Sequence, residues 1–316
     1  MELICGLHNL AKRHRGSVVS IGNFDGLHRG HQALIARLKA LAALHGLPSA
    51  VVIFEPTPRE FFTPASAPPR VADFRGKLRL LERAGVERVL CLRFDRRLAA
   101  FTAEEFIERV LIDGLGARAI IVGDDFRYGA KRKGDLALLQ SAGTCAGFSA
   151  EGLGTVTLDD QRCSSTGLRE ALAKPDLATA EYLLDRRYRM IGRVRHGLKL
   201  GAQLGMPTAN LHLHRPPALA HGVYAVRAYW DAQPQGAPGV ASLGVRPTLG
   251  TTACLLETHV FDFNGSLYGA EFEVEFHHYL RPQRRFDTLD ALAAQMQTDG
   301  REARAFFDSN GNELTT

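Results

Sequence analysis

Residues 22–31 read GNFDGLHRGH and carry the strongest fold signal in the chain. A β-branched run from Ser17 to Ile21 precedes them, and apolar residues recur at helical spacing from about Gly30 to His45. Gly26 and Gly30 allow the backbone to approach a ligand closely, and the start of the following helix offers free N–H groups to an anion. This glycine-rich turn between a strand and a helix therefore predicts a phosphate site in a parallel α/β sheet.

The two histidines of this stretch are candidate catalytic residues. His28 and His31 are three residues apart, so on a first helical turn they share a face. Two imidazoles at that position can donate hydrogen bonds to an ATP phosphate as charge moves onto pyrophosphate. An isolated HxxH pair is more often a surface feature, but the strand before it and the helix after it favour the catalytic interpretation. The accompanying candidates for nucleotide binding are Gly22, Asn23, Phe24, Asp25, Gly26 and Gly30.

Strand and helix signals alternate through the rest of the first half. Strands are predicted at 50–54, 89–94 and 119–122, and helices at 74–84, 102–113 and 134–141. Thr102 and Glu105 form a capping box at the start of one helix. Residues 55–73 are rich in proline and predict a long loop with the freedom to move over a site. The alternation predicts βαβ units and a parallel sheet that binds ligands at the carboxyl ends of its strands.

The pattern changes after about residue 185, where the first domain (1–185) is expected to give way to a second (186–316). Strands are predicted in succession at 188–194, 222–230, 239–245, 255–263 and 271–279, which favours an antiparallel barrel or sandwich. Along the last of them Phe272, Val274 and Phe276 alternate with Glu271, Glu273 and Glu275, which predicts one buried face and one solvated face. A terminal helix is expected over 289–307, with an interruption near Gly300.

The composition narrows the functional classes. The net charge of +5 is spread over both halves, without the clustered Lys and Arg stripe of a duplex-binding surface, so we expect no nucleic-acid partner. The five cysteines are widely spaced and lack a CxxC pair, which is typical of reduced thiols in a cytoplasmic protein. The chain has neither an apolar run of roughly 20 residues nor an apolar segment after its first basic residues, so we expect no membrane span and no signal peptide.

The stretch around the two histidines resembles the HxGH motif of the nucleotidyltransferase superfamily. The longer run GNFDGLHRGHQ is similar to that of the bacterial bifunctional riboflavin kinase/FMN adenylyltransferases, a family also called FAD synthetases. The resemblance continues at 54–56, 101–106, 122–129 and 164–169. It implies that Asp125, Phe126 and Tyr128 contact the flavin nucleotide. It also implies phosphate binding by the SSTxxR block, whose Ser164, Ser165 and Thr166 are good helix N-caps beside Arg169.

A second group of motifs resembles riboflavin kinase. Residues 205–210 read GMPTAN after a glycine-rich stretch, and the resemblance extends to 222–224, 244–248, 256–259 and 267–269. The Thr208 hydroxyl and the Asn210 amide oxygen are hard ligands that suit Mg²⁺ beside ATP phosphates, although a Pro-Thr-Asn turn is common in itself. Glu257 lies on an apparent strand, where by itself it would be an exposed glutamate; the resemblance makes it the candidate general base for the riboflavin 5′-hydroxyl. The resemblance adds Gly192, Gly201 and Pro207 as nucleotide-binding residues and Arg281 as a flavin-binding residue.

Four positions depart from the family pattern. Ala202, Met206, Ser242 and Gln283 stand where the family usually has Arg, Phe, Asn and Glu. We expect kinase chemistry to survive these changes, with altered loop dynamics and flavin affinity. Two other motifs fail: residues 129–135 lack the lysine of a P-loop, and the GxGxxA run at 114–119 precedes a strand instead of following one.

The resemblance therefore implies an α/β nucleotidyltransferase domain followed by an antiparallel β-barrel kinase domain with a terminal helix. Its substrates would be riboflavin, FMN and ATP with Mg²⁺. From the sequence we expect no partner chain beyond a weak homo-oligomer. Two alternatives stay open: an adenylyltransferase for another phosphorylated small molecule, with the barrel as a substrate domain, and a nucleic-acid-binding barrel joined to a degenerate nucleotidyl domain. The outward glutamates expected on the last strand disfavour the second alternative.

Overall fold

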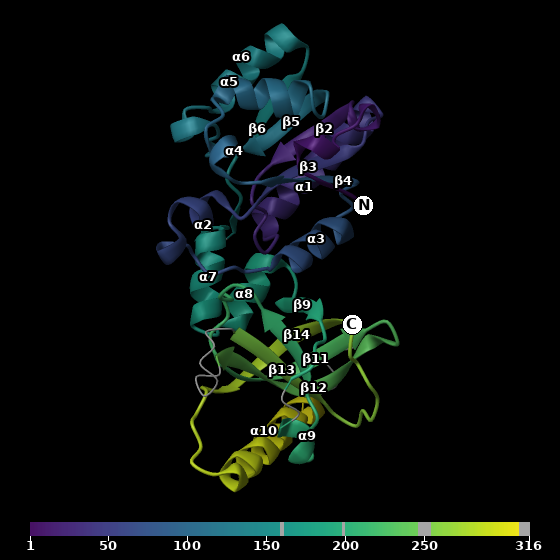
Figure 1. Cartoon of the computed structure of the whole chain (residues 1–316), viewed down its shortest axis with the longest axis vertical. Helices are drawn as coiled ribbons and strands as arrows, with labels where there is room; N and C mark the ends of the chain where they lie inside the picture. Colours follow the sequence, from purple (N-terminus) through teal and green to yellow (C-terminus); the bar gives the residue numbers. More distant parts are fainter. Residues whose placement is uncertain (159–160, 198–199, 246–253, 310–316) are drawn as a thin grey trace. The chain divides into compact units, whose positions relative to one another are not determined.

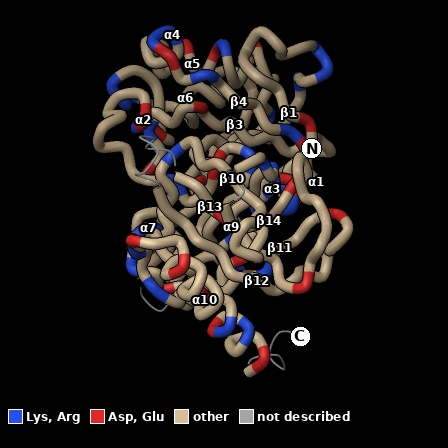
Figure 2. The backbone as a smooth tube through the Cα atoms, turned by 60° about the horizontal axis from the view of Figure 1, so that its bottom comes forward, with Lys and Arg blue, Asp and Glu red and all other residues tan. Residues whose placement is uncertain are grey.

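The computed structural model describes residues 1–158, 161–197, 200–245 and 254–309 (Figure 1). The chain forms two compact units. The first consists of Met1–Pro68 and Lys77–Ser164, and the second of Pro69–Gly76 and Ser165–Thr316. Figure 2 shows basic and acidic residues interspersed along the chain in both units. Among the described residues no helix is long and apolar enough to cross a membrane.

The first unit contains a six-stranded sheet in the order β1-β4-β3-β2-β5-β6, and every pairing between neighbours is parallel. Its strands are β1 (Glu2–Cys5), β2 (Ser17–Ile21), β3 (Ser49–Glu55), β4 (Arg88–Arg93), β5 (Ala117–Gly123) and β6 (Ser149–Leu153). The prediction of a parallel sheet is confirmed. The edge strands β1 and β6 were not predicted, because they are short and largely exposed and so lack the continuous apolar run of a central strand.

The helices of the first 164 residues largely follow the sequence pattern. They are α1 (Arg29–His45), α2 (Pro58–Phe62), α3 (Phe74–Arg83), α4 (Arg96–Ala99), α5 (Ala103–Phe106) and α6 (Leu136–Ala146), with a π-helical turn η4 (Ile107–Ile112) continuing α5. Shorter elements are η1 (Leu7–Asn9), η2 (Lys12–His14), η3 (Pro64–Ser66), η5 (Ala130–Arg132), β7 (Thr157–Leu158) and β8 (Gln161–Arg162). The predicted capping box is confirmed: Glu105 N donates to Thr102 Oγ1 over 3.1 Å, and Thr102 N donates to a Glu105 carboxylate oxygen over 3.0 Å.

The proline-rich segment is not the long loop that we predicted. Pro58 opens α2 at a first helical position, where its missing N–H costs no hydrogen bond, and Thr57 caps that helix. Further along, Arg70 N donates to Pro216 O over 3.0 Å, and Ala218 N donates to Arg70 O over 2.8 Å. Val71 is 2% exposed. The proline-rich segment therefore contains a short helix and a 3-10 turn. It ends in an extended segment at Arg70, which pairs with residues 216–218 of the second unit.

The second unit contains a six-stranded antiparallel sheet in the order β10-β13-β12-β11-β14-β9. Its strands are β9 (Arg189–Arg193), β10 (Ala209–Leu213), β11 (Gly222–Trp230), β12 (Gln233–Val245), β13 (Cys254–Val260) and β14 (Glu271–Arg281). A bridge between Arg195 and Asn210 brings the chain after β9 to the opposite edge strand and nearly closes the barrel. Tyr224, Phe272 and Phe276 are almost fully buried. The predicted barrel is confirmed, with β10 added.

Within the described part of the second unit, the barrel is accompanied by the helices α7 (Ser165–Ala173), α8 (Leu177–Leu184), α9 (Leu200–Gln203) and α10 (Leu289–Ser309). The terminal helix α10 packs against β11 and β12 (Figure 1). The interruption predicted near Gly300 is wrong, because α10 is continuous. Gly300 is instead a buried contact point, where an added Cβ would lie 3.4 Å from Met206 Cε.

The solvated glutamate face predicted on β14 is also wrong in part. Glu273 and Glu275 are only 8% and 7% exposed. Arg189, on the neighbouring strand β9, donates to a Glu275 oxygen over 2.6 Å and to a Glu273 oxygen over 3.3 Å. Burial alone would raise the pKa of Glu275, but the hydrogen bond from His277 and the charge of Arg189 lower it to about 2. A cation from another strand therefore allows the two carboxylates to be buried.

Candidate active sites

The turn after β2 is held in an uncommon backbone conformation. Phe24, Gly26 and Leu27 have φ angles of 47°, 79° and 49°. The left-handed region suits glycine, but for side-chain-bearing residues it costs of order 1–3 kcal/mol each. Phe24 and Leu27 are 0% and 4% exposed, so their buried side chains hold the turn in place. Strain of this kind collects at functional sites.

The two histidines meet where α1 begins. His28 is the N-cap residue of α1, and its ring stacks on that of His31 with centroids 3.8 Å apart and planes 22° apart. The prediction that they share one face is confirmed. His31 packs against the Phe24 ring at 5.2 Å. A Cβ on Gly30 would lie 3.2 Å from the His28 ring, so glycine is the residue that fits there without displacing it.

Cys163 also contacts His28 and was not found from the sequence. Its Sγ lies 3.7 Å from His28 Nδ1, and the thiol is 5% exposed. This contact joins the HxGH turn to the residue that precedes the SSTxxR block. No sequence signal pairs a lone cysteine with a histidine so far away in the chain.

The remaining candidates of the first unit lie after β2 and β5, which are neighbours in the sheet. Asn23 is exposed, whereas Asp25 is 7% exposed. Asp125 forms an exposed ion pair with Arg162 at 2.7 Å. Phe126 stacks on Tyr128 at 5.4 Å, and among the described residues the Tyr128 hydroxyl has no hydrogen-bond partner. Because parallel strands end at one edge, these residues and the histidines occupy the same edge of the sheet.

The SSTxxR block spans the division between the units. Ser164 ends the first unit, whereas Ser165, Thr166 and Arg169 lie in the first turns of α7 in the second. Arg169 Nε donates to Pro69 O over 2.8 Å, and its Nη1 donates to Ser165 O over 3.1 Å. The guanidinium therefore ties the start of α7 to the segment that begins at Pro69.

The kinase candidates converge on three adjacent barrel strands. Asn210 on β10 is the register partner of Glu257 on β13, and Glu257 is in turn the register partner of Ser242 on β12. Side chains directly opposite each other in an antiparallel pair point to the same face, with Cβ atoms about 4.5–5.5 Å apart. The barrel therefore brings the candidate metal ligand and the candidate base into one row.

The loop before β10 closes around this row. An added Cβ on Gly197 would lie 2.8 Å from the Asn210 amide, and one on Gly201 would lie 3.5 Å from Thr208 Oγ1. An added Cβ on Gly192, on β9, would lie 3.2 Å from Leu211 Cδ2. Gly197 and Gly201 thus allow the backbone to approach the candidate ligands closely.

The donor set fits a magnesium ion. Asn210 is 4% exposed, and its amide nitrogen donates to Thr208 O over 3.1 Å. Among the described residues, the buried Asn210 Oδ1 has no hydrogen-bond partner. A buried oxygen without a partner needs a ligand, an ion or water. Together with the Thr208 hydroxyl it supplies the hard oxygens that Mg²⁺ prefers.

Comparisons with known proteins show the family to which the chain belongs. Residues 10–167 match the FAD synthetase family model, and residues 184–307 match the riboflavin kinase model. The chain is 51% identical over 306 residues to the bifunctional riboflavin kinase/FMN adenylyltransferase of Pseudomonas fluorescens, covering 96% of this chain and 97% of that one. The chain belongs to this bifunctional family. It is a transferase of flavin cofactor biosynthesis with riboflavin kinase and FMN adenylyltransferase activities.

A further relative shares the same name, and a solved structure is similar in fold. The enzyme of the same name from Escherichia coli strain K12 is 45% identical over 308 residues, covering 97% of this chain and 98% of that one. A solved structure of a protein named macrolide-efflux protein, from Streptococcus pneumoniae, is similar with a TM-score of 0.77 and 29% identity, covering 96% of this chain and 99% of that chain. Membership of a family of ATP-using enzymes implies that this chain uses ATP.

The positions that depart from the family pattern have contacts of their own. Gln283 Nε2 donates to Ser242 Oγ over 3.4 Å, so two departures form one pair. Met206 packs against Gly300 of α10, and Ala202 is exposed. The motif residues Arg246, Pro247 and Thr248 lie outside the described residues.

Arg281, the candidate flavin-binding residue, forms a bidentate ion pair with Asp299. Its Nε and Nη2 donate to the two Asp299 carboxylate oxygens over 2.7 and 2.6 Å. The Arg281 and Asp299 side chains are 13% and 5% exposed. This bidentate pair joins β14 to α10, so any contact with flavin would add to a role in holding the helix.

Replacing Arg281 with alanine is expected to destabilise the second unit. The change leaves the Asp299 carboxylate buried without its guanidinium partner, which typically costs about 3–5 kcal/mol. Urea denaturation followed by circular dichroism would measure the loss, and the double variant Arg281→Met with Asp299→Leu should recover much of it. A loss below about 0.5 kcal/mol would contradict the anchoring role.

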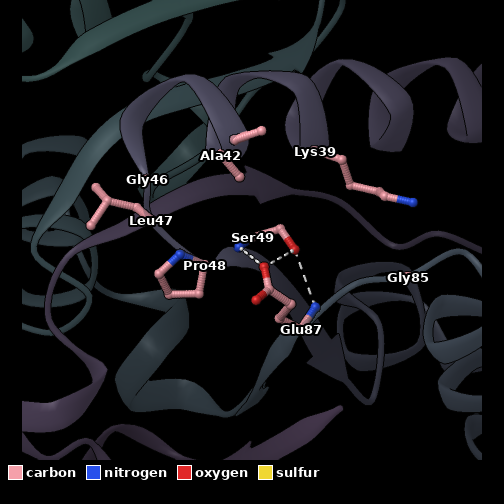
Figure 3. Close-up of a pocket in the computed structure, with 9 residues that line it drawn as sticks. Lys39, Ala42, Gly46, Leu47, Pro48, Ser49, Gly85 and Glu87 are labelled. Carbon is pink, nitrogen blue, oxygen red and sulfur yellow. Dashed lines mark hydrogen bonds between the residues drawn. The ribbon is translucent and has the colours of Figure 1, made fainter.

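A hollow near the amino end of β3 lacks the features of a ligand site (Figure 3). It lies beside the end of α1 and the start of β3, with Lys39 and Glu87 among its lining residues. Glu87 accepts hydrogen bonds from Ser49 N and Oγ over 2.8 and 3.1 Å. Lys39 donates to Ala84 O over 3.0 Å. Both charged side chains are therefore engaged in hydrogen bonds within the protein, and we assign the hollow no role.

Proposed function

We propose that the two reactions occur at separate sites, with FMN adenylylation at the carboxyl edge of the parallel sheet and riboflavin phosphorylation in the barrel. The observation that carries this proposal is the Asn210–Glu257 register, which unites the kinase candidates within one unit, while the stacked His28 and His31 lie in the other. FMN made at the second site would then be the substrate of the first.

In the adenylyl transfer, a phosphate oxygen of FMN attacks the α-phosphorus of ATP, and pyrophosphate leaves. N–H groups of His28 and His31 would donate hydrogen bonds to the phosphate oxygens on which charge accumulates. The start of α1 adds backbone N–H groups, and the turn of Gly22, Asn23, Phe24, Asp25 and Gly26, followed by Gly30, lets the triphosphate approach. The catalytic contribution is therefore positioning and charge stabilisation.

The other first-site residues are assigned to holding the substrates. Ser164, Ser165 and Thr166 would bind triphosphate oxygens together with Arg169. Asp125, Phe126 and Tyr128 would contact the flavin nucleotide. Burial raises the pKa of Tyr128, so its phenol stays protonated and can donate a hydrogen bond at neutral pH.

In the kinase reaction, the riboflavin 5′-hydroxyl oxygen attacks the γ-phosphorus of ATP, and ADP leaves. Thr208 Oγ1 and Asn210 Oδ1 would hold Mg²⁺, which supplies charge neutralisation at the phosphates when bound. The Glu257 carboxylate would accept the hydroxyl proton as the new P–O bond forms. Gly192, Gly201 and Pro207 would line the nucleotide, and Arg281 would border the flavin.

We further propose a cytoplasmic location and at most weak self-association. The support for the location is that Cys5, Cys91, Cys145, Cys163 and Cys254 are all free thiols, as a reducing compartment would keep them. The net charge of +5, with basic and acidic residues interspersed along the chain (Figure 2), gives no reason to expect nucleic acid as a partner.

The domain boundary is proposed at residues 185 and 186, although the compact units divide at Ser164 and Ser165. Helix α7 contributes to the second unit, since Ala220 N donates to Leu172 O over 3.0 Å. We therefore expect fragments 165–316 and 186–316 both to phosphorylate riboflavin, the shorter one with the lower melting temperature. Kinase assays and thermal unfolding measure both properties. Inactive fragments from several neighbouring start points would contradict the independence of the kinase site.

The direct test of the proposed function is to incubate the purified protein with riboflavin and Mg²⁺–ATP and to separate the flavins by chromatography. FMN should appear first and FAD after it. Substituting FMN for riboflavin should give FAD directly. Failure to convert riboflavin, with turnover of a different phosphorylated acceptor, would favour the alternative adenylyltransferase.

A further inference from the structure

A histidine next to the candidate base contacts the loop that carries Thr208, one of the two candidate metal ligands. His259 lies two residues after Glu257 on β13, so the two side chains share a face of the strand. His259 Nδ1 lies 2.8 Å from Pro207 O, and because a carbonyl can only accept, the imidazole donates. Pro207 immediately precedes Thr208.

The same loop is held from its other side by α10. Met206 packs against Gly300, where an added Cβ would lie 3.4 Å from Met206 Cε. Phe261 borders this contact: its ring is 5.8 Å from the His259 ring and lies under the Arg304 guanidinium at 4.2 Å. Loop, strand and terminal helix therefore form one packed cluster at the entrance to β10.

The position of Thr208 depends on these loop contacts more than the position of Asn210 does. Asn210 lies inside β10, whose pairing with β13 fixes its position opposite Glu257. Thr208 precedes β10 and is outside that ladder. Pro207 has no N–H with which to bond a neighbouring strand, so its carbonyl is the backbone group available for a tether.

We propose that His259 is a positioning residue of the kinase site, which keeps Thr208 in register with Asn210 and Glu257 through its hydrogen bond to Pro207. This inference rests on the proposed metal site. The bond to the carbonyl places the proton on Nδ1 and so fixes the orientation of the ring. A displacement of about 1 Å in a positioned group can cost up to about 10²-fold in rate, so a single lost tether is a measurable defect.

Two substitutions separate the hydrogen bond from the packing of the ring. His259→Phe keeps an aromatic ring beside Phe261 but removes the donor. His259→Asn loses the ring but retains an amide N–H close to the position of Nδ1. His278, an exposed histidine on β14 that stacks on Phe306 at 5.0 Å, provides the matched control as His278→Phe.

The readouts are the Mg²⁺ dependence of ADP binding, measured by calorimetry on the full chain, and the steady-state kinetics of both reactions. For His259→Phe we expect about a tenfold higher Mg²⁺ concentration at half-maximal ADP binding and about a tenfold lower kinase kcat. The KM for riboflavin and the adenylylation of supplied FMN should stay near wild type. His259→Asn and His278→Phe should stay within about threefold of wild type on every readout.

Other outcomes would contradict either the role of the hydrogen bond or the metal site itself. Wild-type Mg²⁺ dependence in His259→Phe, or an equal defect in His259→Asn, would show that the hydrogen bond does not position the ligands. Asn210→Ala separates this from a failure of the metal site, because it should weaken Mg²⁺-dependent ADP binding further than His259→Phe. If Asn210→Ala binds normally, the metal assignment itself is wrong. Thermal unfolding of each variant identifies the temperature range in which all are folded.

Discussion

Kinase kcat is expected to fall by about 10²-fold or more when Glu257 is replaced by glutamine, with riboflavin binding little changed. A primary hydroxyl is a poor nucleophile until its proton has an acceptor, and we propose the Glu257 carboxylate, opposite Asn210 in the sheet register, as that acceptor. Glutamine keeps the size of the side chain and one hydrogen-bonding oxygen but is not basic. The loss should therefore fall on kcat rather than on the KM for riboflavin.

Steady-state kinetics of both reactions and a riboflavin titration test this expectation. FAD synthesis from supplied FMN should stay near wild type, because Glu257 and the stacked histidines belong to different units. Glu302→Gln, at an exposed position on α10, serves as the matched control. If Glu257→Gln melts like wild type and retains full kinase kcat, Glu257 is a structural residue of β13 and the base lies elsewhere.

FAD formation is expected to collapse when His28 is replaced by alanine, whereas FMN formation should persist. Loss of one positioned donor to a developing negative charge costs about 10²–10³-fold in kcat. His31→Ala should act in the same direction, because its ring stacks on that of His28. The kinase reaction provides an internal control for folding of the second unit.

Product chromatography measures both flavins in a single assay of each variant. His45→Ala, near the exposed carboxyl end of α1, is the matched control for the loss of a histidine from the same helix. A folded His28→Ala protein that lost both activities would refute the assignment of this histidine to one of two separate sites. Undiminished FAD formation would remove it from the catalytic machinery.

Much of the fold follows from local sequence. Strand β2 has the predicted bounds, because both of its faces are buried and its apolar run is continuous. Strand β10 was missed because its first residues belong to a Pro-Thr-Ala-Asn turn pattern. The burial of Glu273 and Glu275 was missed for another reason: an alternating pattern reports polarity, but not whether a residue such as Arg189 covers the polar face.

Some contacts of the candidate sites could likewise be predicted from the sequence, and others could not. The contact of His28 with His31 was predictable from their spacing of three residues at the start of α1, although His28 itself is the extended N-cap residue. The alignment of Asn210 with Glu257 depends on the register of strands that are distant in sequence, and neither motif specifies it. The partners of Arg281 and His259 lie on other elements, so their roles as anchors became visible only in the folded chain.

A complementation assay tests the central claim of two separate sites most directly. His28→Ala should convert riboflavin to FMN and stop, and Glu257→Gln alone should form FMN only slowly and therefore little FAD. Mixed in one solution with riboflavin and Mg²⁺–ATP, the two variants should restore FAD formation, because FMN released by one protein is a substrate for the other. A mixture of folded variants that forms no more FAD than either variant alone would contradict this account.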